Sequence, residues 1–192
     1  MESESYKNNK TSTYLAEIII LKSQIITKYE YYAKQAKKEG FEQINSIFLE
    51  TLNQEKNHIK TIFRLLKGQN PEVTMVINSS VIGTTVENLK DAINSEKEIV
   101  SKIEEYNKVI WEEGNKKEFT KLKLFEQISS FYIERFMKFS SNIENGTVFK
   151  KDKKVKWICR KCGLIHESLS ALHNCPGCEH PQAYFEVLAE NY

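Results

Sequence analysis

Apolar and aromatic side chains recur at intervals of three and four residues through most of the chain up to residue 145. This period places them along one face of a helix, so each such stretch predicts an amphipathic helix with one buried face. A glycine follows every stretch, and glycine commonly ends helices because it adopts left-handed backbone conformations without strain. The four predicted helices span residues 11–39, 41–67, 84–113 and 115–145.

The connections between these helices indicate how they are arranged. Gly40 and Gly114 each mark a short turn, whereas residues 69–83 break the helical period and form a long connection. Only seven glycines and three prolines occur in the 192 residues, which favours long helices over a sandwich or barrel. Four helices with two short turns and one long crossover describe an all-α, ferritin-like four-helix bundle, which we assign to residues 1–148.

The two halves of the predicted bundle resemble each other. The segment AKKEGFEQI, residues 36–44, aligns with WEEGNKKEF, residues 111–119, so that Gly40 lies over Gly114 at an offset of 74 residues. The two helix pairs are therefore copies of one helical hairpin. The offset pairs Lys22 with Glu96, Glu55 with Ser129, and His58 with Tyr132.

Two polar side chains interrupt the apolar face of the second predicted helix. Glu55 and His58 lie three positions apart on that face. Four-helix bundles use this Glu-x-x-His spacing to hold di-iron centres, because both side chains project into the bundle. A buried carboxylate is costly unless it is paired or bound to metal, so an inward glutamate predicts one or the other.

A complete di-iron centre needs further ligands, and the repeat indicates where they should lie. Glu96 is present on the third helix, but the equivalent residue of the first helix is Lys22, whose ammonium repels a divalent cation. Ser129 and Tyr132 stand where a second Glu-x-x-His would lie. We therefore predict no di-iron centre, with one weakly held metal on Glu55, His58 and Glu96 as the alternative. The predicted metal-free network, closed by salt bridges, consists of Lys22, Glu55, His58 and Glu96.

Charge and apolar content limit the partners of the chain. The formal net charge of +2 shows no basic excess, which argues against a nucleic-acid partner. The N-terminal segment MESESYKNNKTSTY has no apolar core of a secretory signal, and no apolar run approaches the ~20 residues that span a membrane. We expect a soluble cytoplasmic protein.

All four cysteines fall in the last part of the chain as two Cys-x-x-Cys pairs. Without an export signal, such pairs favour one metal bound by four thiolates over two disulfides. The spacing leaves iron and zinc open, because zinc ribbons use the same arrangement. The lysine-rich residues 149–156 are predicted to be a linker to this metal domain, residues 157–192. The predicted ligands are Cys159, Cys162, Cys175 and Cys178.

These motifs together resemble one known family. The segment WICRKCGLIHESLSALHNCPGCEHPQAYFEVLAENY, residues 157–192, resembles the C-terminal rubredoxin domain of rubrerythrins. Residues 31–59 resemble the first half of the rubrerythrin bundle, and residues 88–98 resemble the start of its second half. The resemblance implies a rubredoxin-like β domain that holds one iron and transfers single electrons, with zinc as a substitute. It also implies a homodimer, an electron-donating partner protein, and hydrogen peroxide reduction at a di-iron site.

The chain departs from the family pattern inside the bundle. Its Glu55, His58 and Glu96 match positions of family ligands, which makes them remnants of the di-iron set. No catalytic residue is predicted, so the leading hypothesis is electron transfer through the cysteine site. A peroxide reductase with an altered metal site and a structural zinc-ribbon protein without a redox role are the alternatives. The departures, where the family has a carboxylate or histidine, are Lys22, Ile99, Ser129 and Tyr132.

Overall fold

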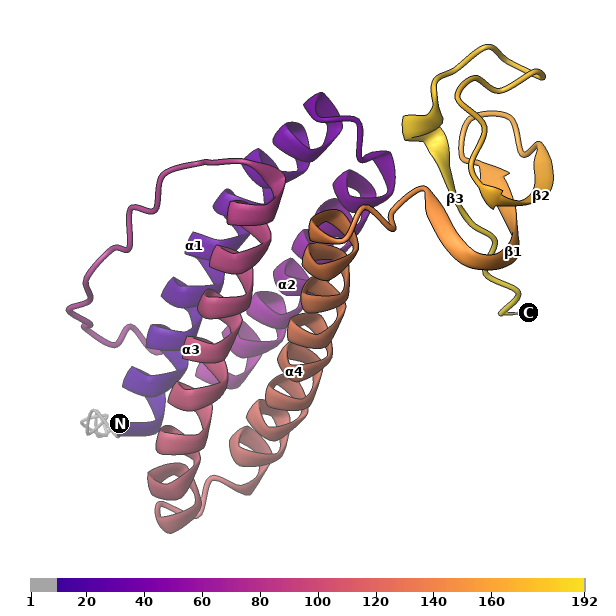
Figure 1. Ribbon diagram of the computed structural model, residues 1–192. Coiled ribbons are helices and arrows are strands. Elements are labelled where there is room, and N and C mark those ends of the chain that lie inside the picture. The colour runs from indigo at the N-terminus through magenta and orange to yellow at the C-terminus, as the bar shows by residue number, and fades with distance from the viewer. Residues whose placement is uncertain (1–9, 192) are drawn as a thin grey trace, which may run out of the picture.

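The computed structural model describes residues 10–191 and contains a four-helix bundle joined to a small C-terminal sheet (Figure 1). Residues 1–9 of the predicted bundle domain and residue 192 lie outside the described part. The ferritin-like bundle is confirmed, and each helix end lies one residue from its predicted position. The helices are α1 (Lys10–Lys38), α2 (Glu42–Leu66), α3 (Thr85–Glu112) and α4 (Lys116–Glu144).

The two short turns of the bundle have the same backbone geometry. Gly40 and Gly114 both adopt left-handed conformations, with φ of 85° and 77°. The residue after each glycine donates its amide hydrogen to a carbonyl five positions earlier, Phe41 to Ala36 at 2.8 Å and Asn115 to Ile110 at 3.1 Å. A side chain at either glycine would strain this turn. The two turns aligned by the predicted repeat therefore share one geometry, which the end of α4 at Gly146 also adopts.

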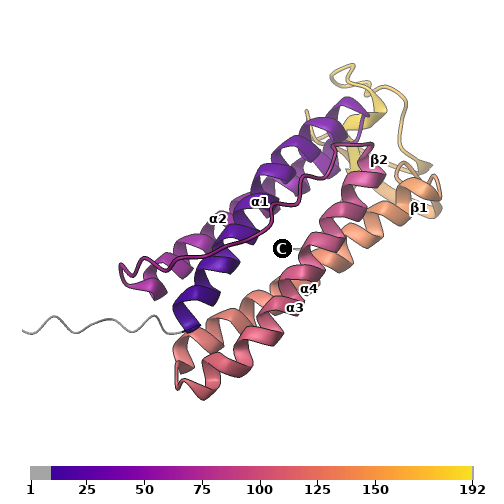
Figure 2. The same ribbon diagram turned by 90° about the vertical axis from the view of Figure 1, so that its left-hand side faces the viewer.

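The long crossover between α2 and α3 runs along the outside of α1 (Figure 2). Asp91 of α3 holds it there, because its carboxylate accepts hydrogen bonds from Ser80 of the crossover at 2.7 Å and from Lys28 of α1 at 3.0 Å. Thr84 then begins α3 with a capping box, in which Glu87 bonds back to the amide of Thr84 at 2.8 Å.

The C-terminal sheet has three antiparallel strands in the order β2-β1-β3. Its strands are β1 (Lys150–Cys159), β2 (Ile165–Ser170) and β3 (Phe185–Val187), with the short helix η1 (Gln182–Tyr184) before β3. Most of the predicted linker, residues 149–156, therefore belongs to β1, which corrects that prediction. The pairing with β2 covers Lys150 and Val155 to Ile158, with an irregularity between them. Val155, Trp157 and Cys159 alternate towards the small core.

The sheet packs on the end of the bundle where α1 turns into α2. Phe41 stacks on Phe149 with ring centroids 6.3 Å apart, and a side chain at Gly40 would lie 3.6 Å from Ala183. The core of the sheet contains Trp157 and Phe185, both fully buried. None of the helices within residues 10–191 is long and apolar enough to cross a membrane.

Candidate metal centre

The four cysteines lie in two turns that share one pattern of backbone hydrogen bonds. In the first turn, the amide of Cys159 donates to the carbonyl of Leu164 at 2.9 Å, and Gly163 donates to the carbonyl of Cys159 at 2.8 Å. Cys175 makes the corresponding two bonds in the second turn, where Glu179 replaces Gly163. Both of these residues have left-handed backbones, with φ of 77° for Gly163 and 61° for Glu179. Each turn therefore presents two thiols to the same point.

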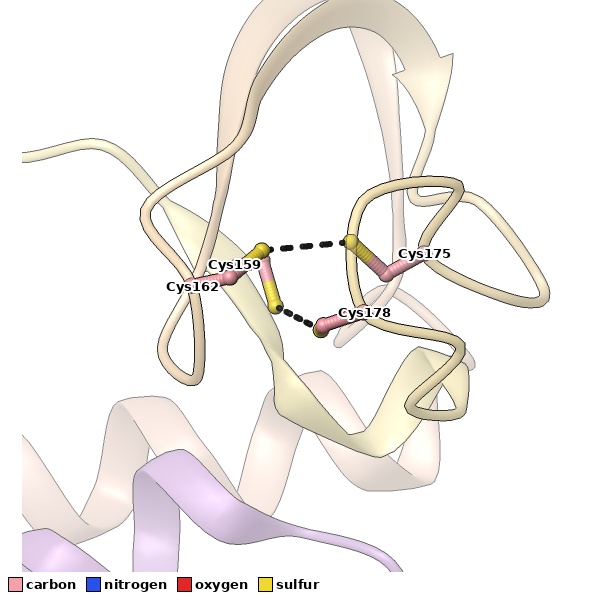
Figure 3. A group of neighbouring side chains, drawn as sticks. All are labelled: Cys159, Cys162, Cys175 and Cys178. Atoms are coloured by element: carbon pink, nitrogen blue, oxygen red, sulfur yellow. Dashed lines mark hydrogen bonds between the residues drawn. The ribbon is translucent and has the colours of Figure 1, made fainter.

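The sulfur atoms of the two turns converge (Figure 3). Cys159 Sγ lies 3.8 Å from Cys178 Sγ, Cys162 Sγ lies 3.5 Å from Cys175 Sγ, and all four lie within 4.8 Å of one another. A tetrahedral metal with bonds of about 2.3 Å would hold its sulfurs about 3.8 Å apart. The free thiols therefore fit a rubredoxin-like metal site. No other group of three or more metal-ligating side chains converges in this way within residues 10–191.

Backbone amides around the cluster favour thiolates, the form that binds metal. Burial opposes ionisation of Cys175, but hydrogen bonds from the amides of Gly177 and Cys178 and from neighbouring thiols together outweigh it and lower the pKa of this thiol to about 7. The amide of His180 favours the Cys178 thiolate, yet burial and the neighbouring thiols raise its pKa to about 12. Without a metal the thiols thus compete for one negative charge. Three sulfurs accept an amide: Cys162 from Leu164, Cys175 from Gly177 and Cys178 from His180.

The centre of the bundle contains an ion pair between Lys22 and Glu55. It is expected from the sequence, because Lys22 stands where the family pattern has a metal ligand. Lys22 Nζ lies 2.6 Å from Glu55 Oε2, and both side chains are fully buried. Burial alone would raise the pKa of Glu55, but the Lys22 ammonium and the neighbouring His58 together outweigh it and lower the pKa below its ordinary value. His58 Nδ1 lies 3.3 Å from the other Glu55 oxygen without hydrogen-bond alignment. The predicted salt bridge between α1 and α2 is confirmed.

Glu96 is hydrogen-bonded to a tyrosine, whereas the predicted network of salt bridges pairs it with a cation. The hydroxyl of Tyr29 donates to Glu96 Oε1 at 2.7 Å, and both residues are fully buried. Burial and the charge of Glu55 raise the pKa of Glu96 to about 7, although Lys22 and the Tyr29 hydrogen bond act in the opposite direction. Glu96 is therefore the carboxyl of the centre that is protonated most easily.

The remaining departures from the family pattern offer little to a second metal. Ile99 is apolar and buried, and the hydroxyl of Tyr132 is used in a hydrogen bond to Gln54 at 2.8 Å. Ser129 is fully buried, and its hydroxyl has no hydrogen-bond partner within the described chain. The structure places Glu55, His58 and Glu96 in the core as predicted, but does not bring them together as a metal-ligand group.

The sequence analysis does not identify two residues that support these sites. Tyr29 follows Lys22 by two helical turns and shares its buried face, so the helical period indicates its burial but not its bond to α3. Glu179 takes the left-handed position of the second cysteine turn, and its sequence carries no signal for this conformation. Comparison with the first turn, where Gly163 has that role, provides the only indication.

The raised pKa of Glu96 predicts a pH dependence of stability. The folded protein keeps a proton on Glu96 between pH 4.5 and about 7 that the unfolded chain releases, so this group disfavours folding increasingly as the pH rises through that window. The free energy of unfolding of the wild type should fall between pH 5 and pH 8. In Glu96→Gln this fall should be smaller, and the difference between the two falls should be roughly 2–3 kcal/mol. Denaturant unfolding at the two pH values measures the difference.

The matched control for this measurement is Glu98→Gln, which alters an exposed residue of the same helix. It should keep the wild-type change between the two pH values. Equal pH dependence in Glu96→Gln and the wild type would contradict the protonation of Glu96.

A ferritin-like bundle joined to a small sheet with four converging cysteines defines a two-domain metalloprotein of the ferritin and rubredoxin type. The chain belongs to the rubrerythrin family: the family model for rubrerythrin matches residues 14–130, and the model for its rubredoxin-like domain matches residues 157–186. This family binds iron.

Relatives agree with this assignment, and solved structures share the fold. The chain is 38% identical to a rubrerythrin of Clostridium perfringens, over 98% of this chain and 100% of that protein, and 35% identical to a rubrerythrin of Porphyromonas gingivalis, over 98% and 95%. The fold matches nigerythrin in a partially reduced state with a TM-score of 0.63 and 24% identity, over 97% of this chain and 90% of the other. Bacterioferritin of Mycobacterium tuberculosis matches 76% of this chain and 90% of its own, with a TM-score of 0.65 and 12% identity.

Proposed function

We propose that this protein is a one-electron carrier that uses a single iron on the four cysteines and has no di-iron centre. The convergence of four free thiols carries the first half of the proposal. Cys159, Cys162, Cys175 and Cys178 would hold the iron, which supplies one-electron redox chemistry when bound. The amides of Leu164, Gly177 and His180 stabilise negative charge on the sulfurs and so influence the reduction potential.

The Lys22–Glu55 ion pair supports the second half of the proposal. Its ammonium lies 2.6 Å from the carboxylate oxygen that a metal would need, and it brings a positive charge to the same place. The unpartnered oxygen of Glu96 is available, but Ser129 and Ile99 add no anionic donor. The residues present therefore do not fit a pair of metal ions, and we derive no peroxide chemistry from them.

Partners and location form part of the same proposal. Cys162 is exposed, so an electron-donating protein would approach the cluster from the side on which this cysteine lies. Exposed apolar side chains on α2 and α4, among them Phe63 and Phe131, support a homodimer. We propose a cytoplasmic location because the four thiols need a reducing compartment to remain free. We also propose that residues 1–148 and 157–192 are separate domains, joined by the first half of β1.

Metal analysis and visible spectra test this proposal. We expect about one iron per chain in protein from its native source, and a red colour that dithionite bleaches, because a tetrathiolate site holds one redox-active ion. About three irons per chain together with peroxide turnover would contradict the proposal in favour of a peroxide reductase. Zinc in place of iron would instead indicate a structural zinc site.

A further inference from the structure

The crossover between α2 and α3 contains an exposed apolar segment, VINSSVI, at residues 76–82. The side chains of Val76, Ile77 and Val81 are 90%, 73% and 89% exposed, and that of Ile82 is 45% exposed. The first three are the most exposed large apolar side chains within residues 10–191. A cluster of apolar side chains held in water on a folded protein marks an interaction surface.

The backbone of this segment is free to pair with another strand. It runs along the outside of α1 without a turn (Figure 2), and residues 70–82 make no backbone–backbone hydrogen bond within the described part of the chain. Proteins usually protect such an edge with charged residues or proline, because it is a template for pairing with another chain. Residues 73–83 contain neither a charged residue nor a proline.

A contact with α1 determines which edge of the segment is free. The amide of Asn78 donates to Gln24 Oε1 of α1 at 3.4 Å. Successive amides of an extended chain point to opposite edges, so those of Ile77, Ser79 and Val81 point away from α1. Since the segment is already held along the bundle, pairing at this edge requires little further ordering.

The sequence of the segment identifies a second copy of the same chain as its partner. The order of apolar and polar residues in VINSSVI is the same in both directions, with Ser79 at the centre. Antiparallel pairing of two copies around Ser79 places Ile77 opposite Val81 of the second copy. It also places Val76 opposite Ile82. All four apolar residues are β-branched, and cross-strand pairs of such residues stabilise a sheet.

We propose that residues 76–82 pair with the same residues of a second copy of this protein, as an antiparallel ribbon with its two-fold axis at Ser79. Its hydrogen-bonded pairs are Ser79 with Ser79 and Ile77 with Val81, because these amides lie on the free edge. Both copies contribute the same surface, so the contact closes after two chains. It is separate from the exposed side chains of α2 and α4 and from the cysteines, and therefore goes beyond the proposed function.

Ser79→Cys tests the two-fold axis in the full-length, metal-loaded protein. Opposite residues of a hydrogen-bonded antiparallel pair have Cα atoms about 5.5 Å apart, within the range of about 4.4–6.8 Å that a disulfide spans. Mild oxidation should link most chains in pairs, which non-reducing gel electrophoresis detects as a doubled mass. Thr74→Cys, also exposed, is the matched control. Two copies of residue 74 lie about 30 Å apart in this ribbon and should remain unlinked, as in the wild type.

Charge substitutions at two exposed positions test the pairing without altering the core. Ile77→Lys/Val81→Lys places like charges opposite each other twice across the two-fold axis, and should halve the molar mass measured by sedimentation equilibrium. Ile77→Lys/Val81→Glu places opposite charges at the same two points, and should keep the wild-type molar mass.

Several results would overturn the proposal: a wild-type protein that sediments as a single chain, an unchanged molar mass in the double-lysine variant, an equal loss in both charge variants, or no linked pairs in Ser79→Cys. An association that the double-lysine variant leaves intact would assign the homodimer to another surface, such as that of α2 and α4. The iron content and visible spectrum test the electron carrier separately, because no substitution here touches the cysteine site.

Discussion

Replacing Lys22 with alanine is expected to lower the free energy of unfolding by about 3–5 kcal/mol, because it leaves a buried carboxylate without its cation. Glu55 is fully buried, and Lys22 is its partner at 2.6 Å. His58 cannot replace the ammonium in place, since its Nδ1 lies 3.3 Å from Glu55 without hydrogen-bond alignment. Chemical denaturation followed by the helical circular dichroism signal measures the loss.

Two further variants separate the effect of charge from the effects of volume and of ion pairs in general. Lys22→Met keeps most of the side-chain volume and removes the charge, so it should remain strongly destabilised. Lys34→Ala breaks the exposed pair with Glu30, whose atoms lie 2.8 Å apart, and should cost less than about 1 kcal/mol. Stability of Lys22→Met equal to that of the wild type would show that Glu55 needs no cation, which contradicts the ion-pair account.

The helices of this protein are predictable from its sequence because local signals determine them. Apolar residues at helical spacing identify each buried face, and glycines such as Gly40 and Gly114 mark where the chain must turn. The same period places Lys22, Glu55 and Glu96 in the core, and the structure confirms all three. The ion pair between α1 and α2 follows once two opposite charges are known to be buried in one small core.

Features that depend on contacts between distant segments are not predictable in this way. Tyr29 bonds to Glu96 across 67 positions of sequence, and only the packing of α1 on α3 brings them together. The lysines of β1 resemble a solvated linker because strand pairing supplies no signal in a charged sequence.

The cysteine cluster lies between these two cases. The Cys-x-x-Cys spacing predicts that each pair of thiols shares one turn, and two such turns predict a four-sulfur site. The backbone geometry that aligns them is visible in the sequence for Gly163 but not for Glu179, which reaches the same left-handed conformation through the hydrogen bonds of its turn. The identity of the four ligands is thus predictable from the sequence. The backbone conformations that position them are predictable only in the first turn.

Loss of the cysteine ligands is expected to unfold the C-terminal sheet and leave the bundle helical. The buried residues of this core are Trp157 and Phe185 with three others, two of them cysteines of the cluster, so few apolar contacts remain without the metal. Structural metals contribute about 10–16 kcal/mol to the folding of domains this small. In Cys162→Ser/Cys175→Ser, we expect loss of bound metal and of the structure around Trp157, with little change in helical content.

The two tryptophans make this result measurable, because Trp157 reports on the sheet and Trp111 on the bundle. In a Trp111→Leu background, the emission of Trp157 should shift to the red in the double cysteine variant as its fully buried ring becomes exposed. Lys161→Ser changes an exposed residue between two of the cysteines, and should keep both the metal and the buried emission. A cysteine variant with unshifted Trp157 emission would show that the sheet folds without its metal. Because the bundle has its own core and its own Lys22–Glu55 pair, it should unfold separately, at a denaturant concentration that the cysteine substitutions leave unchanged.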